Sequence, residues 1–462
     1  MAKVLRIEPD KRVSAIRQAQ ELVDADELDK AYEVIQDQMV SNPNDPQCLI
    51  VAAAIIKKAN KPAVAYSLAK RAVELAPERP ESWTILGWCA QTLWRMDEAL
   101  SSYNKALERA DSKERKALQM NNMGSVYLDK GSFKDAETIL RKAFDLTPND
   151  KTTRHNLALS LLAQQKWKEG WALYSSSVGS KNRVKWKYKK PPNEEPEWDG
   201  TKGQTVVVYG EQGLGDEISF ASMIPDVCKD AKVIVDCDAR LEGLFKRSFP
   251  EAAVYGTRWK KELSWAKEHR DMDASISMGE MGKFYRNEPA DFPGTPFLTP
   301  CPVRTEGWKQ FFKPLQKPVI GIAWTGGTWA NGAINRNLPL DEWGPIFKAV
   351  DAHWVNLEYK ERDTSDFNIT TYPWATLTKD YDDTAALVAA CDMVVTMQTA
   401  VGHLAGGLGI PTWVMVPKNS QWRYGEAEET LPWYKSMRIF RANGDWTPVV
   451  NRIARELRDV DF

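Results

Sequence analysis

The amino-acid sequence predicts two fold classes in one chain, an α-helical repeat array followed by an α/β region. Small residues recur about every 34 positions through the first 175 residues, which is the period of a repeated helix pair. After Gln204, short runs rich in Val and Ile alternate with helix-type segments, which indicates parallel strands joined by helices. The length of 462 residues suits two to four folding units.

The composition is that of a folded protein without a strong overall charge. Hydrophobic residues make up 43% and charged residues 27%, which excludes a mostly disordered chain. The 62 basic and 63 acidic residues nearly cancel, so binding to nucleic acid or anionic lipid would need a local patch. The six cysteines lack C-x-x-C spacing and predict buried thiols in a reducing compartment. The N-terminus has no secretory signal, and we expect a cytoplasmic protein.

One uncharged run, Met393–Val416, is long enough to cross a bilayer. It contains Gln398, His403, Pro411 and four glycines, and both of its ends are β-rich. We therefore predict a buried strand, a glycine-rich helix and a second strand here, not a membrane span.

The repeat period is carried by small side chains. Five of them are separated by 34, 34, 37 and 34 residues, and each has another small residue 12 positions earlier. Small residues let two helices cross closely, and a proline after the second helix turns the chain into the next unit. The period residues are Ala31, Ala65, Ala99, Ala136 and Gly170, with prolines at Pro43, Pro77 and Pro148. The third copy has tetratricopeptide spacing, so residues 10–175 resemble five tetratricopeptide repeats.

Residues 179–204 break this pattern and predict a linker. Between Lys181 and Lys190 there are six basic residues and no acid, and lysines alternate there with Val184, Trp186 and Tyr188. An extended segment would have one basic and one aromatic face. We favour an aromatic-anchored linker with a solvated basic face over a contact with the phosphates of a nucleic acid or with an anionic acceptor.

The α/β region predicts two sheets joined by the proline-rich residues 286–318. The expected strands are Thr205–Tyr209, Lys232–Asp236, Ala274–Ser277, Val319–Trp324, His353–Leu357, Met393–Thr396 and Thr412–Val416.

Three of these strands lead into glycine-rich segments that suit anion binding. After the first strand, Gly213 and Gly215 lie in a turn before a helix, and backbone N–H groups at such a helix start are unpaired. Asp216 at this turn is either a helix cap or a carboxylate that accepts a proton. The spacing differs from the G-x-G-x-x-G of dinucleotide enzymes.

The other two segments follow the strands that end near residues 324 and 396. Arg336 offers a fork of donors to phosphate oxygens, and Trp324 and Trp329 border the loop as candidates for stacking or packing. Thr399 begins a glycine-rich helix, and His403 lies one turn later on the same face.

Residues 198–440 resemble the heptosyltransferase-like glycosyltransferases, in the bacterial form that is fused to tetratricopeptide repeats. The resemblance rests on Trp198-Asp-Gly, Glu211-Gln-Gly-Leu-Gly-Asp216, Arg336-Asn-Leu-Pro-Leu340, Asp383-Thr-Ala, Thr399-Ala-Val-Gly-His-Leu-Ala405 and Leu431-Pro-Trp-Tyr-Lys-Ser-Met-Arg438. It implies a GT-B fold with two Rossmann-like halves. The expected domains are a repeat array (1–178), a linker (179–204), an acceptor-side half (205–300) and a donor-side half (301–462).

The resemblance also implies roles for individual residues. Asp216 matches the general base and Arg336 the group that stabilises the diphosphate. Thr325 and Gly326 fall in the phosphate loop, and Glu358 and Lys360 fall where the nucleoside is held. Thr399, Ala400, Val401 and His403 match the donor-binding helix start. The family often has an acid where this chain has Gln398, so the donor sugar is left open.

The expected function is an inverting glycosyltransferase that uses a nucleotide sugar, with no metal and no other cofactor. A D-x-D pair such as Asp236-Cys-Asp238 recurs elsewhere in the chain and does not indicate a metal site. The repeats would recruit a protein or glycan acceptor, or mediate self-association. The alternatives are a non-catalytic scaffold with a degenerate nucleotide-sugar module, and a glycosyltransferase that acts on modified nucleic acid.

Overall fold

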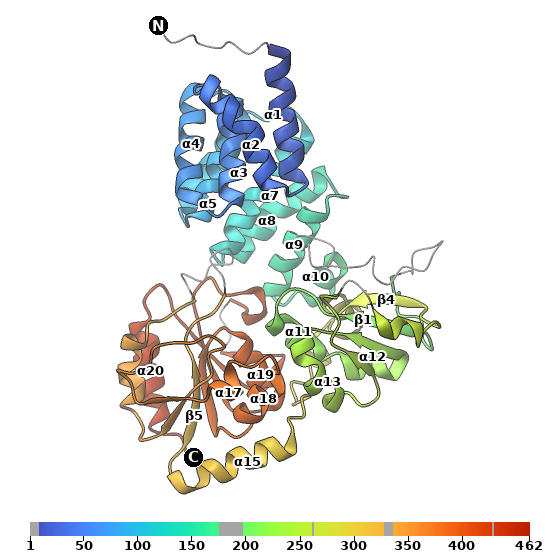
Figure 1. The fold of residues 1–462 in the computed structure, drawn as a ribbon, viewed down its shortest axis with the longest axis vertical. Helices are drawn as coiled ribbons and strands as arrows, with labels where there is room; N and C mark the ends of the chain where they lie inside the picture. Colours follow the sequence, from blue (N-terminus) through green and yellow to red (C-terminus); the bar gives the residue numbers. More distant parts are fainter. Residues whose placement is uncertain (1–8, 175–196, 261–262, 328–335, 427–428) are drawn as a thin grey trace. The chain divides into compact units, whose positions relative to one another are not determined.

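The computed structural model describes residues 9–174, 197–260, 263–327, 336–426 and 429–462. The chain divides into two compact units, Met1–Leu157, which is helical, and Ala158–Phe462, which holds two mostly parallel sheets (Figure 1). The basic segment 181–190 and Trp329 lie outside the described residues. In the described part of the chain, no helix is long and apolar enough to span a membrane.

The N-terminal helices follow one another as pairs. Pro46, Pro62 and Pro80 open three of them, at the position where a helix tolerates proline, and Asp45 caps one by accepting from Gln47 N–H at 2.8 Å. The pairs are α1 (Pro9–Asp24) with α2 (Leu28–Ser41), α3 (Pro46–Lys58) with α4 (Pro62–Leu75), α5 (Pro80–Thr92) with α6 (Met96–Glu108), α7 (Lys113–Asp129) with α8 (Phe133–Leu146), and α9 (Lys151–Ala163) with α10 (Trp167–Leu173).

The predicted small residues lie where the two helices of a pair cross. Ala31, Ala65, Ala99 and Ala136 have no exposed surface. A Cβ atom added to Gly87 would lie 2.7 Å from the ring of Tyr103 on the partner helix. The prediction of helix pairs with close crossings is therefore confirmed.

Each pair turns through one residue in the left-handed conformation. These residues are Asp26, Asn60, Trp94, Gly131 and Gln165, all with φ between 58° and 69°. Their spacing repeats that of the small residues, so every helix pair uses the same turn geometry although only one of the five residues is glycine.

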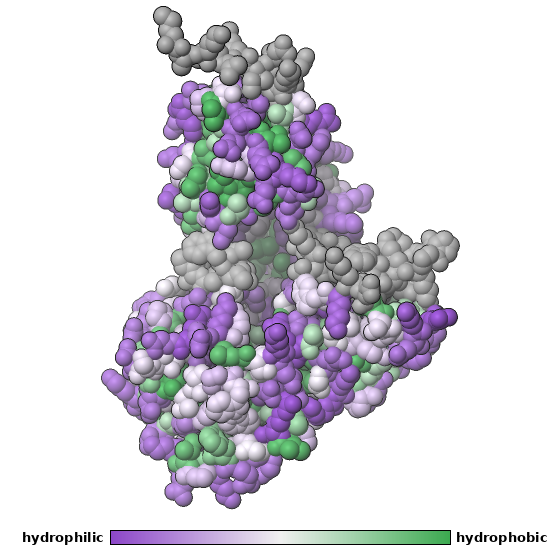
Figure 2. Space-filling model, in the orientation of Figure 1, coloured by the Kyte–Doolittle hydropathy of each residue, from purple (hydrophilic) through white to green (hydrophobic). Residues whose placement is uncertain are grey.

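A pocket of about 570 Å³ opens on the helical unit. Figure 2 shows hydrophobic side chains gathered among hydrophilic ones on the visible face of this unit. The pocket is lined by Leu28, Asp29, Tyr32, Glu33, Ile55, Ile56, Ala59, Lys61 and Val64.

The first sheet has the order β3-β2-β1-β4, with all strands parallel. Its strands are β1 (Thr205–Tyr209), β2 (Lys232–Asp236), β3 (Ala253–Tyr255) and β4 (Ala274–Ser277). Its helices are α11 (Leu214–Ala221), α12 (Ile224–Asp230), α13 (Glu242–Ser248) and α14 (Gly282–Tyr285).

The second sheet has the order β10-β11-β9-β8-β5-β6-β7 and is parallel except for the β10–β11 pair. Its strands are β5 (Val319–Ala323), β6 (His353–Asn356), β7 (Ile369–Thr371), β8 (Met393–Met397), β9 (Thr412–Val416), β10 (Thr430–Leu431) and β11 (Tyr434–Arg441). The helices are α15 (Pro302–Phe312), α16 (Gly344–Phe347), α17 (Pro373–Thr376), α18 (Tyr381–Val388), α19 (Ala400–Leu408) and α20 (Thr447–Leu457).

All seven predicted strands are present, and Met393–Val416 forms β8, α19 and β9 as expected. Both sheets have the doubly wound order, in which β1 and β5 lie where the direction of winding reverses. Ligands of such sheets bind at the carboxyl ends of the strands at this point. The fold therefore places the glycine loops after β1 and β5 at the expected ligand-binding edges.

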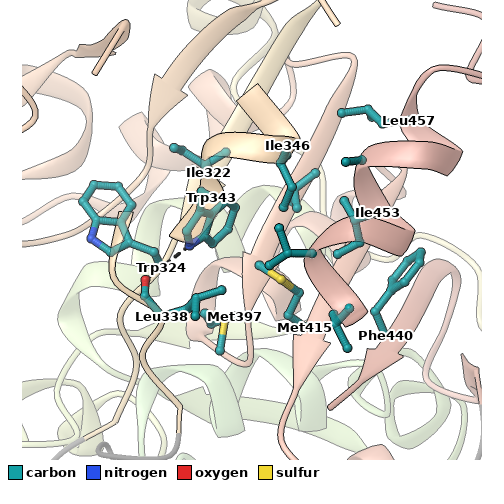
Figure 3. Packing of buried hydrophobic residues seen from close by; sticks show 14 of the residues in the cluster. Ile322, Trp324, Leu338, Trp343, Ile346, Met397, Met415, Phe440, Ile453 and Leu457 are labelled. Atoms are coloured by element: carbon teal, nitrogen blue, oxygen red, sulfur yellow. Dashed lines mark hydrogen bonds between the residues drawn. The ribbon is translucent and has the colours of Figure 1, made fainter. Parts of the chain in front are cut away.

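The core of the second sheet is rich in indole rings. Trp324 and Trp343 are at most 5% exposed and pack with Ile346 and Met415 in one cluster (Figure 3). The Trp343 indole N–H donates to the carbonyl of Leu338 at 3.2 Å. The Trp324 side chain therefore has a packing role in this structure.

Candidate functional site

The first turns of α11 and α19 lie against each other. The helix α11 follows β1 of the first sheet, and α19 follows β8 of the second. A Cβ atom added to Gly215 in α11 would lie 3.2 Å from Cα of Ala400 and 3.1 Å from Cδ2 of His403 in α19. Glycine at position 215 thus permits the close approach. Because both helices start here, their unpaired N–H groups make this region favourable for an anion.

Asp216 lies in the first turn of α11 and uses both carboxylate oxygens. Oδ2 accepts from the N–H of Gly213 at 2.9 Å, which caps the helix, and Oδ1 lies 2.7 Å from Nη1 of Arg423. Its side chain is 19% exposed. A carboxylate has about four acceptor positions, so Asp216 can accept further hydrogen bonds beside these two contacts.

Arg423 is the partner of Asp216 that sequence reasoning missed. It lies in a short 3-10 helix (Trp422–Tyr424), and its Cζ is 4.5 Å from the ring centres of both Phe220 and Trp422. Only its position between two aromatic residues, Trp422 and Tyr424, signalled an unusual arginine in the sequence.

His403 is buried between two tyrosines. Its Nδ1 lies 3.1 Å from the hydroxyl of Tyr434, and its Nε2 lies 3.5 Å from that of Tyr424. Burial, with the Arg423 charge nearby, lowers the pKa of His403 to about 3. The ring is therefore neutral at physiological pH and acts through hydrogen bonds.

Arg336 acts on the same group of side chains. Burial raises the pKa of Tyr424, while the positive charges of Arg423 and Arg336 oppose that shift. The predicted diphosphate-binding arginine therefore lies within electrostatic range of the residues around His403.

The backbone N–H groups of the loop after β5 donate hydrogen bonds to side chains of the protein itself. The buried carboxylate of Glu358 accepts from the N–H groups of Trp324 at 2.8 Å and Thr325 at 2.7 Å, and Asn337 Oδ1 accepts from Gly326 N–H at 2.7 Å. Glu358 thus fixes the loop, and the two amides predicted to bind phosphate already have partners. Lys360 is exposed, with Nζ 5.1 Å from the centre of the Tyr359 ring.

The start of α19 combines polar side chains with backbone N–H groups. Thr399 precedes Ala400 and Val401, and its hydroxyl lies 3.1 Å from that of Thr396, with no side-chain cap on the helix. A Cβ atom on Gly326 would lie 3.0 Å from the carbonyl of Gln398, so the β5 loop reaches this helix start. The first-turn amides of α19 are therefore the best placed donors for an anion.

Comparison with known proteins identifies the N-terminal region. The family model of the Chs5p-Arf1p-binding proteins (ChAPs) matches residues 3–127, and a tetratricopeptide-repeat model matches residues 120–150. The N-terminal region is therefore tetratricopeptide-like. Protein FlbA of Caulobacter vibrioides is 26% identical over 450 residues, which cover 91% of this chain and 74% of FlbA.

Solved structures of other proteins are similar to part of the chain. TTC0263, a thermophilic tetratricopeptide-repeat protein of Thermus thermophilus, is 22% identical, with 37% of this chain and 93% of that chain covered and a TM-score of 0.34. PilW, a type IV pilus biogenesis factor, is 19% identical. The match covers 36% of this chain and 76% of PilW, with a TM-score of 0.33.

Proposed function

We propose that the α/β unit is an inverting, metal-independent glycosyltransferase of the GT-B type, which transfers a sugar from a nucleotide sugar to an acceptor hydroxyl. The observation that supports this most is the meeting of the α11 and α19 helix starts, with Asp216 of α11 paired with the buried Arg423. Two doubly wound sheets, each with a loop at its switch point, are the layout that a GT-B enzyme needs.

In this proposal Asp216 accepts the proton of the acceptor hydroxyl as its oxygen attacks the anomeric carbon. The first-turn amides of α19, together with Arg336, stabilise the negative charge that grows on the leaving diphosphate. His403 is neutral and, through Tyr424 and Tyr434, keeps α19 in position. Positive groups thus fill the role that a metal ion plays in other transferases.

The tetratricopeptide-like region is proposed to bind a protein, either the acceptor or a partner, in the cytoplasm. Repeat surfaces of this kind bind extended chains. The pocket around Leu28, Tyr32 and Val64 is a surface on the helical unit that suits such a segment.

The decisive test is a thermal-shift screen with UDP-, GDP-, ADP- and CDP-sugars, followed by an assay of sugar transfer. We expect one nucleotide family to stabilise the protein. Asp216→Asn should lose transfer while it retains donor binding, and Arg336→Ala should weaken donor binding about tenfold. Full turnover by Asp216→Asn would remove the general base, and unchanged affinity in Arg336→Ala would remove the diphosphate site.

A second candidate is a scaffold without catalysis. It is favoured by the loop after β5, where Thr325 and Gly326 already donate inside the protein. If no nucleotide sugar stabilises the chain, while repeat-dependent binding of a protein partner persists, the scaffold replaces the enzyme. The nucleic-acid alternative rests on residues 181–190 and requires DNA binding that weakens steeply with salt.

A further inference from the structure

Arg423 has an unused pair of hydrogen-bond donors. Its Nη1 is paired with Asp216, but its Nε and Nη2 are buried without a partner among the residues that the structure describes. The residue is 3% exposed. Buried donors in proteins nearly always have partners, so an unused pair calls for an acceptor.

Another buried arginine of the same unit shows how such a group is normally satisfied. Arg286 is 2% exposed and donates to the carboxylate of Asp226 and to the carbonyls of Tyr285 and Ser222. Arg423 has one carboxylate and, within the described ranges, no carbonyl at its Nε and Nη2.

The two aromatic rings decide from which direction an acceptor approaches. The rings of Phe220 and Trp422 each lie 4.5 Å from the Arg423 Cζ and occupy space close to the guanidinium. A hydrogen-bond acceptor must approach in the plane of the group, where its N–H bonds point. Nε–H and Nη2–H lie side by side on one edge of that plane, and such an edge binds two oxygens of one phosphate or carboxylate.

A second buried donor without a partner in the described part of the chain belongs to Gln398, whose side chain contacts a residue close to Arg423 in the sequence. Gln398 directly precedes the N-cap of α19, and its Oε1 accepts from the N–H of Gln421 at 3.3 Å. Its Nε2 is buried and lacks a partner within the described part of the chain. Gln421 is two residues from Arg423, so both unused donors belong to one region at the α19 start.

We propose that the Nε/Nη2 edge of Arg423, with the Gln398 amide and the α19 amides, binds a phosphate of the nucleotide-sugar donor. The identity of the ligand rests on the proposed function. The assignment also gives Arg423 a role in positioning Asp216. Because Arg423 also holds Asp216, it sets the distance between the donor phosphate and the residue that deprotonates the acceptor. Both nitrogens are enclosed in the structure, so in this proposal the surrounding side chains shift when the phosphate binds.

The test measures the affinity of the full chain for inorganic pyrophosphate by calorimetry. Arg423→Lys keeps the charge and the pair with Asp216 but loses the two-donor edge, so we expect its Kd to rise at least about tenfold. Arg304→Lys is the matched control, because Arg304 forms exposed ion pairs with Asp380 and Asp383 and should leave the Kd unchanged. Melting temperatures verify that each variant is folded.

Asp216→Asn provides a second measurement that does not depend on how Arg423→Lys folds. It removes the negative charge beside the proposed phosphate, so pyrophosphate should bind at least as tightly as to the wild type. The inference is overturned if wild-type protein does not bind pyrophosphate, if Arg423→Lys binds it equally well, or if Asp216→Asn weakens it tenfold. Binding that depends on Arg423, in a protein that transfers no sugar, would instead overturn only the proposed enzyme.

Discussion

His403 lies in the first turn of α19 with each ring nitrogen near a tyrosine hydroxyl. A buried imidazole that gains a proton must hold a charge away from water, beside the positive Arg423. Its folded-state pKa of about 3 therefore lies below the ordinary value of 6.5. The unfolded chain binds this proton below pH 6.5 and the folded protein does not, so the free energy of unfolding falls as the pH drops toward 3.

We expect His403→Gln to reduce the acid sensitivity of the protein. The wild type should lose up to about 1.4 kcal/mol of stability per pH unit through this one group below pH 6.5. Glutamine has no proton to gain and keeps hydrogen-bonding capacity toward the tyrosines. Urea unfolding between pH 7 and pH 4 should show a shallower decline for the variant. Equal declines would mean that His403 is protonated in the folded state.

The residues of the candidate site were predictable to different degrees. Asp216 and Arg336 each follow a strand and a glycine-rich segment, and Thr399 stands between a strand and a glycine-rich helix, so local pattern was enough to single them out. Arg423 lies more than 200 residues after Asp216 and follows no such pattern, and only the tertiary structure brings the two side chains together. The partner of a residue depends on tertiary structure, which local periodicity does not contain.

Among the strands and helices, too, those with a clear local pattern were predicted and those without one were missed. The predicted strands are four to six residues long, whereas β3 and β7 have three residues each and give no periodic signal. In β11, Lys435, Arg438 and Arg441 interrupt the apolar pattern. The helix α15 was missed because residues 286–318 are rich in proline, although Pro302 stands at its first turn, where proline is tolerated.

Glycine-to-alanine changes test how closely the repeat helices cross. In Gly87→Ala the added Cβ would lie 2.7 Å from the Tyr103 ring, and we expect a loss of roughly 1–3 kcal/mol in stability. Gly307→Ala in α15 is the matched control, because a Cβ there meets nothing within 4 Å and alanine favours a helix by about 1 kcal/mol. Thermal unfolding should show opposite shifts. A neutral Gly87→Ala would mean that the helices separate at little cost.

At the scale of the whole molecule, the division into Met1–Leu157 and Ala158–Phe462 predicts two unfolding events. The boundary falls within α9 (Lys151–Ala163), so α10 belongs to the α/β unit. Trp171 of α10 is 1% exposed, with its ring 6.4 Å from Phe220 and 5.7 Å from Trp422. Trp171→Ala should cost about 3–5 kcal/mol and lower the melting temperature of the α/β unit.

Calorimetry of the full chain should therefore resolve two unfolding transitions, each of which responds to a different substitution. Trp171→Ala should lower one of them and Gly87→Ala the other, since the two residues belong to different units. Because Phe220 and Trp422 flank Arg423, Trp171→Ala should also weaken pyrophosphate binding, whereas Gly87→Ala should not. A single transition lowered by both substitutions would show instead that the repeats and the α/β unit unfold together, and the helix α10 would then belong to one cooperative structure.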